Sequence, residues 1–315
     1  MLRDQRKKRG QTKAKPGSAG LTLIQSRLFD VACGSDAPQE ITYQHSLLCQ
    51  TALPYRAPPP GAAEWTRRQG NASLLVEAGK VLDEETGEWS RIGLPWGPKA
   101  RLVLMHLNSE AVKTRSPHVD VGESLTAFVK RLGLDTGGRT LRTIKEQVGA
   151  LSAATIRMSF SGQGAGRQVN AHIVRGFDLW PQKDERQRVL WPSWVDLSLD
   201  YFESLTQHAV PLDEQAIGAL SHSAMSLDIY AWLAQRLHRI PPGTNQFIAW
   251  PMIRAQFGPD YGRLNKFREV FMVALRQVVT VYPAAVIDVT AGGLTLHHSA
   301  PPVTKTRIGG ATLPR

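Results

Sequence analysis

The chain has 315 residues, of which 42% are hydrophobic and 21% are charged, and its mean hydropathy is −0.24. This composition excludes a disordered or fibrous chain and predicts a soluble protein with one large domain or two of ordinary size. No apolar run approaches the roughly 20 residues that span a bilayer, and none follows the basic N-terminus as in a signal peptide. We therefore expect a cytoplasmic protein without a membrane partner.

The charge of the chain is strongly positive and unevenly distributed. The formal net charge is +11, which predicts an acidic partner. Residues 1–15 hold seven basic and one acidic side chains, residues 99–157 hold ten and five, and residues 236–276 hold seven and two. The two internal blocks coincide with stretches of helical periodicity. They predict two positively charged helical surfaces, for which nucleic acid is the default ligand.

The first third of the chain predicts little regular core. Residues 1–20 are predicted to form a disordered basic arm, and the proline run at 53–63 is predicted to be extended. Between 73 and 94, two strand-like runs flank the polar turn DEETG and predict a β-hairpin. Residues 21–94 therefore predict a short β-rich lead-in with a Pro-rich linker.

The next segment, 95–190, predicts a first winged-helix domain. Pro98 is suited to open a helix over 98–114, and a short helix follows over 124–132. After the turn LDTGGR, apolar residues at helical spacing predict another helix from Thr140 to about residue 153. Alternating residues over 156–173 then predict a hairpin, which we interpret as the wing.

The same order of elements recurs over 191–302 and predicts a second winged-helix domain. A strand is expected at 196–202, short helices at 213–220 and from Pro251 to Gly258, and a longer helix from Ser226. A long helix with Phe267 and Phe271 on its inner face should end at Pro283. A hairpin with Ile287, Val289, Leu294 and Leu296 directed inward completes the domain. The predicted fold is thus α+β and mainly helical, with tandem winged-helix domains, β-hairpin wings and a flexible tail at 303–315.

Several motifs resemble those of a known family. RIGLPWGPKARLVLMHLNSEAV, SLTAFVKRLGL and GGRTLRTIKEQV, and later DLSLDYF, DIYAWLAQRL and FREVFMVALRQVVTVYP, are similar to the RepA-type plasmid replication initiators of Gram-negative bacteria. The resemblance covers about residues 41–302. It implies binding to repeats in double-stranded plasmid origin DNA, help in opening the duplex, and recruitment of host replication proteins such as the initiator and the helicase. It also implies repression of the initiator's own gene by a homodimer.

The helices near 139–153 and 263–281 are predicted to enter successive major grooves, where arginine pairs with guanine and asparagine with adenine. The hairpin would add contacts to phosphate or the minor groove. The candidate DNA-binding residues are Arg139, Arg142, Lys145, Arg157, Arg167, Arg263, Asn265, Lys266 and Arg276. For the helical candidates the alternative is a solvent-facing charge that pairs with a neighbour on its own helix. For Arg157 and Arg167 the alternative is an ordinary exposed hairpin.

The sequence argues against an enzymatic function. The chain has no GxxxxGK[ST], GxSxG or HExxH motif, and no His-x-His triplet of a nicking enzyme. His297 and His298 are adjacent in a predicted strand and face opposite sides, and Cys33 and Cys49 lack metal-site spacing. We expect no catalysis, metal or cofactor. A winged-helix transcriptional regulator and a basic interaction scaffold remain open alternatives.

Overall fold

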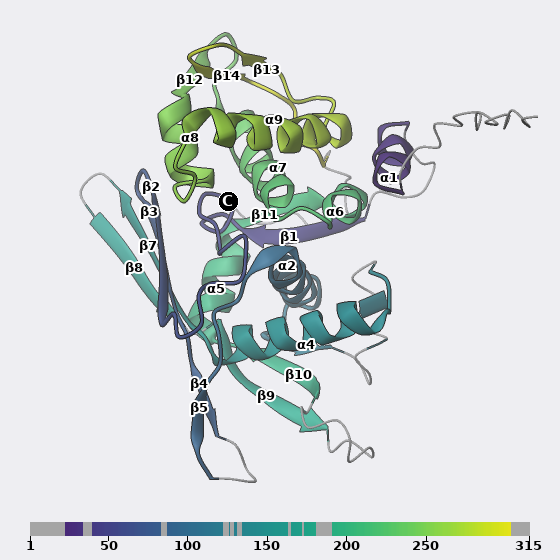
Figure 1. Cartoon of the computed structure of the whole chain (residues 1–315), viewed down its shortest axis with the longest axis vertical. Coiled ribbons are helices and arrows are strands. Elements are labelled where there is room, and N and C mark those ends of the chain that lie inside the picture. The colour runs from purple at the N-terminus through teal and green to yellow at the C-terminus, as the bar shows by residue number, and fades with distance from the viewer. Residues whose placement is uncertain are drawn as a thin grey trace, which may run out of the picture.

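The computed structural model describes residues 23–33, 40–82, 87–121, 126, 129–130, 134–162, 165–171, 173–180 and 191–303. The predicted arm at 1–20 lies outside the described residues, as do residues 304–315 of the predicted tail. Of the helix predicted at 124–132, residues 126, 129 and 130 are described and are helical. Figure 1 shows the chain as an elongated molecule, with β13 and β14 near one end and β9 and β10 toward the other.

The first half of the chain alternates strands with two long helices. The predicted helix at 98–114 is confirmed as α2, and Pro98 occupies its first turn. The helix predicted from Thr140 begins two residues earlier, as α4. The elements are α1 Leu23–Ala32, β1 Ile41–His45, β2 Glu64–Gln69, β3 Ala72–Glu77, β4 Lys80–Leu82, β5 Trp89–Arg91, α2 Gly97–Thr114, β6 His118–Asp120, α4 Gly138–Ala153, β7 Thr155–Gly162, β8 Ala165–Ala171, β9 Val174–Trp180 and β10 Trp191–Leu197.

The second half is mostly helical and closes with a three-stranded sheet. Its elements are α5 Leu199–His208, β11 Ala209–Asp213, α6 Glu214–Leu220, α7 Ala224–Arg236, η1 Leu237–Arg239, β12 Asn245–Ala249, α8 Trp250–Phe257, α9 Leu264–Val281, β13 Ile287–Val289 and β14 Gly293–His297. The predicted helices from Ser226 and Pro251 and the long helix up to Pro283 are confirmed as α7, α8 and α9. β12, β14 and β13 pair in that order.

The hairpin predicted over 156–173 exists as β7 and β8, and it pairs with a strand of the predicted lead-in. β7 and β8 extend a four-stranded antiparallel sheet in the order β2-β3-β7-β8, with Leu74 of β3 opposite Met158 of β7. The strand β6, which follows α2, instead pairs with β10 of the next hairpin. The lead-in therefore packs into the first half of the fold, because β3 needs β7 to satisfy its backbone hydrogen bonds.

Two further expectations are wrong. The segment 196–202 is not a strand, because β10 ends at Leu197 and Ser198 caps α5 by accepting a hydrogen bond from the Tyr201 N–H. An N-cap side chain of this kind fixes the helix start. In the last hairpin Leu294 and Leu296 are fully buried, whereas Val289 is 46% exposed because it lies at the end of the edge strand β13.

Two hydrophobic cores hold the fold together, and α2 contributes to both. The first core contains Leu74 of β3, Leu104 of α2 and Ile144 of α4. The second gathers aromatic residues of α7, α8 and α9 and includes Leu102 and Met105 of α2. Within it the rings of Trp250 and Phe271 lie 5.9 Å apart at 83°, an edge-to-face geometry that stabilises aromatic clusters. Helix α2 therefore fixes one core against the other.

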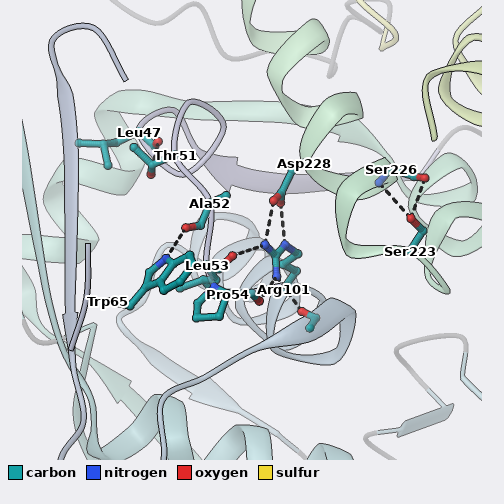
Figure 2. A network of polar contacts seen from close by, with 11 residues as sticks. Leu47, Thr51, Ala52, Leu53, Pro54, Trp65, Arg101, Ser223, Ser226 and Asp228 are labelled. Carbon is teal, nitrogen blue, oxygen red and sulfur yellow. Dashed lines mark hydrogen bonds and ion pairs between the residues drawn. The ribbon is translucent and has the colours of Figure 1, made fainter. Parts of the chain in front are cut away.

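A buried ion pair joins the same two parts of the chain. Arg101 of α2 donates from Nε and Nη2 to the two carboxylate oxygens of Asp228 of α7, at 2.7 and 2.8 Å. Its remaining N–H groups donate to the carbonyls of Leu53, Pro54 and Gly97 (Figure 2). Although burial opposes the charge, the Asp228 carboxylate raises the pKa of Arg101. The guanidinium is fully satisfied, as a buried cation requires.

Candidate nucleic-acid interface

The N-terminus of α4 is fixed by a short polar network. Asp135 accepts a hydrogen bond from the Gly137 N–H at 3.0 Å and another from the Thr140 hydroxyl at 2.9 Å. These two bonds lower the pKa of Asp135. Farther along, the buried Gln147 accepts a hydrogen bond from the Trp96 N–H at 2.7 Å. Helix α4 is thus fixed by Asp135 at its N-terminus and by the Gln147–Trp96 hydrogen bond on its buried face.

The outer face of α4 is basic, as its periodicity predicts. Ile144, Val148 and Leu151 are buried against the first core, and this places Arg139 and Arg142 on the exposed side. Their side chains make no ion pair within the described part of the chain. Lys145 lies half-buried on the flank, and this burial lowers its pKa.

The helix α9 presents a second outward face. Phe267, Phe271 and Val278 are fully buried, so the opposite side faces solvent. Arg263 has an extended backbone and precedes the helix as its N-cap residue. Asn265, Lys266 and Arg276 are exposed on the helix itself.

The turn that leads into α9 packs closely on the helix. A Cβ at Gly258 would lie 2.5 Å from the ring of Phe267, so only glycine fits where α8 ends. Glycine at this position lets the Phe267 ring of α9 pack directly against the end of α8.

Two residues that the sequence interpretation did not select lie on the same face of α9. Glu269 forms an ion pair with Lys266 at 3.0 Å, and both side chains are 67% exposed. Val273 is 55% exposed, one turn beyond Glu269. Helical spacing from Lys266 would have identified both. The pair is an ordinary helix-surface contact and contributes little to stability.

One of the two hairpin candidates, Arg157, is less available than the helical ones. Arg157 is exposed on β7, but its Nη1 lies 2.8 Å from a carboxylate oxygen of Glu77 on β3. Arg167 lies opposite Phe160 in the β7–β8 pair, and its side chain is outside the described residues. Figure 1 shows α4 and α9 on either side of α2.

The residues described above fall largely inside a known family. The family model of the plasmid-encoded RepA protein matches residues 94–252, about half of the chain. The chain belongs to the plasmid-encoded RepA family. The match runs from just before α2 into α8, so it includes the basic face of α4 and both partners of the Arg101–Asp228 pair, whereas α9 follows it. Membership supports a role as a plasmid replication initiator.

Solved structures provide a second comparison for this RepA-family chain. The crystal structure of RctB domains 2-3 covers 79% of this chain and 94% of its own, at 9% identity and a TM-score of 0.48. A selenomethionine form of RctB domains 2 and 3 gives 80% and 96% coverage at 8% identity and the same TM-score. No curated protein matches the chain. Within the described residues, no helix has the length and apolar character to cross a bilayer.

Proposed function

We propose that the chain initiates plasmid replication by binding repeated sites in duplex origin DNA through the outer faces of α4 and α9. The observation that carries the proposal is the pair of exposed basic helix faces. They lie on separate hydrophobic cores, and a buried ion pair joins those cores. Such an arrangement suits a protein that contacts two successive grooves of one duplex.

We interpret both halves as winged-helix units. In the second half α7, β12, α8 and α9 are followed by the β13–β14 hairpin, and the sheet order β12-β14-β13 supports this interpretation. In the first half α2, β6 and α4 follow one another as α7, β12 and α9 do in the second half. The hairpin β9–β10 pairs with β6 through β10, as the hairpin β13–β14 pairs with β12 through β14. The proposed wing of the first unit is therefore β9–β10.

The proposed contacts follow from the chemistry of each side chain. Arg139 and Arg142 of α4 would donate paired hydrogen bonds to guanine O6 and N7, and Asn265 would pair with adenine. Arg263, Lys266 and Arg276 would neutralise phosphates and fix the register. Arg157 would have to leave Glu77 to bind phosphate, so we assign it a minor contribution.

Later steps would depend on partners. Binding would help to open the duplex and recruit the host initiator and helicase, and a homodimer would repress the gene of the chain. The proposal assigns the chain no catalytic step, metal or cofactor, so the free energy for strand opening would come from binding and from DNA supercoiling.

Replication in trans tests the proposal against its alternatives. The chain, supplied from a second plasmid, should maintain a plasmid that carries only the origin, whereas Arg142→Ala and Lys266→Ala variants should fail to do so. A transcriptional regulator would change promoter activity without maintaining the origin. Deleting residues 1–15 tests the alternative that the chain is an interaction scaffold. If the basic arm binds a host protein, the deletion variant should keep its DNA affinity but fail to support replication.

A further inference from the structure

A cleft lies away from the outer faces of α4 and α9, where β7 approaches α5, α7 and α8. Two cavities of about 350 and 390 Å³ adjoin there, and Gln50 and Phe160 line both. β7 belongs to the first half of the fold, whereas α7 and α8 belong to the second. The cleft is large enough to enclose most of a small ligand.

The described side chains that line the cleft include no aspartate or glutamate. The lining instead supplies two guanidinium groups, from Arg236 and Arg239, and several amides. Arg239 is exposed and makes no ion pair in the part of the chain that the structure describes. Arg236 is held by a hydrogen bond from Nε to the Gln246 side chain at 2.9 Å. The cleft therefore favours an anionic ligand.

Apolar groups also line the cleft. Phe160 is 45% exposed and Met252 is 58% exposed. Exposed side chains of this size do not stabilise the fold by burial, and exposed apolar groups that lie together often mark a binding site. Trp232, in the wall of the 390 Å³ cavity, is 1% exposed, and its indole N–H has no hydrogen-bond acceptor among the described residues. An exposed ring, a nearby guanidinium and an unused donor suit a flat heteroaromatic ring that carries a phosphate.

The polar pair at the floor of the cleft is not arranged for catalysis. His45 Nε2 lies 3.0 Å from the Ser204 hydroxyl, while His45 Nδ1 accepts a hydrogen bond from the Leu47 N–H at 3.1 Å. Burial, together with the nearby His208, lowers the pKa of His45 to about 4. The neutral ring therefore carries its proton on Nε2 and donates it to Ser204, so it cannot remove the serine proton.

We propose that this cleft binds a nucleotide-type ligand, with the base stacked on Phe160 and the phosphate held by Arg239. The same chemistry is offered by a free nucleotide and by an unpaired stretch of a nucleic-acid strand. The site is separate from the duplex surface on α4 and α9, so the proposal stands or falls independently of the proposed function.

The test is fluorescence anisotropy of a labelled ten-residue oligothymidylate with the full chain. We expect saturable binding that Phe160→Ala weakens about tenfold or more, since stacking of one base has that magnitude. Arg239→Ala should also weaken binding, because it removes the contact to the phosphate. Phe29→Ala and Arg91→Ala are matched controls, because Phe29 is 59% exposed on α1 and Arg91 is exposed on β5. Both controls should leave the affinity unchanged, and thermal unfolding should show that every variant is folded.

Competition identifies the source of the ligand. Displacement of the oligonucleotide by thymidine monophosphate at comparable concentration would indicate a free nucleotide, whereas displacement by oligonucleotides alone would indicate an unpaired strand. The Arg142→Ala, Lys266→Ala double variant should lose duplex affinity and keep oligothymidylate binding. The proposal is overturned if the wild type binds neither probe. It is also overturned if Phe160→Ala has no effect, since that result describes a simple anion site.

Discussion

Arg101 on α2 and Asp228 on α7 form a two-point ion pair, with the Nε–Oδ1 distance at 2.7 Å and the Nη2–Oδ2 distance at 2.8 Å. Both side chains are almost fully buried between the two hydrophobic cores. The pair therefore sets how the half that carries α4 lies against the half that carries α9.

Removing one partner of this pair should destabilise the whole chain. Asp228→Ala leaves the Arg101 guanidinium buried without a counter-charge, which costs about 3–5 kcal/mol in the free energy of unfolding. Urea denaturation followed by circular dichroism measures the change. The double variant Arg101→Met, Asp228→Leu should recover much of the loss, because it replaces both charges with apolar groups. An unfolding free energy for Asp228→Ala equal to that of the wild type would show that the pair is not buried in solution.

Helix α4 should supply sequence specificity. Arg142→Ala removes an exposed side chain, so stability should be almost unchanged. Loss of one paired contact to guanine should weaken binding to the origin repeat by about 5- to 150-fold. Competition with scrambled duplex should show that nonspecific binding changes much less. Arg91→Ala, with the same charge change on β5, is the control; an equal loss in both variants would indicate a general charge effect.

Helix α9 should contribute through phosphate contacts. Lys266→Ala should weaken all duplexes by a similar factor and reduce the slope of log affinity against log salt by about 1. Lys266→Arg should retain the slope, because it keeps the charge. A titration at several salt concentrations distinguishes this result from the alternative, in which Lys266 only pairs with Glu269 and the slope does not move.

The last hairpin should depend on one of its two adjacent glycines. A Cβ at Gly293 would lie 2.1 Å from the carbonyl oxygen of Ile248 on the neighbouring strand, whereas a Cβ at Gly292 would meet the Phe247 ring at 3.5 Å and the Thr290 hydroxyl at 3.9 Å, both ordinary contact distances. Gly293→Ala should therefore separate β12 from β14 and lower the unfolding temperature clearly. Gly292→Ala should have little effect. Equal unfolding temperatures for the two variants would contradict the described register.

Elements with strong hydrophobic periodicity could be predicted from the sequence, whereas the pairing of strands that are distant along the chain could not. The inner face of α9 was correct residue by residue, because Phe267, Phe271, Ala274, Leu275 and Val278 recur at helical spacing. The partner of the β7–β8 hairpin was missed, since β3 lies about 80 residues earlier and no local pattern encodes which strands meet. The start of α5 was missed because the alternation DLSLDYF imitates a strand, while the Ser198 cap decides the outcome.

In the candidate site, too, the helical positions could be predicted from the sequence and the contacts between distant segments could not. Helical periodicity correctly placed Arg139, Arg142, Asn265, Lys266 and Arg276 on exposed faces. It could not show that Arg157 pairs with Glu77 on the neighbouring strand β3, nor that Phe160 lines a cleft with residues of α7 and α8, because both depend on the packing of distant segments.

A nuclease footprint on duplex DNA flanking the gene of the chain tests the central claim most directly, at roughly physiological salt to suppress nonspecific binding. The account predicts repeated protected sites, each with two segments about one helical turn apart. Arg142→Ala should lose one segment of each site and Lys266→Ala should weaken the other. Absence of protected repeats with the wild type, or loss of both segments together in each variant, would contradict binding through two separate helix faces.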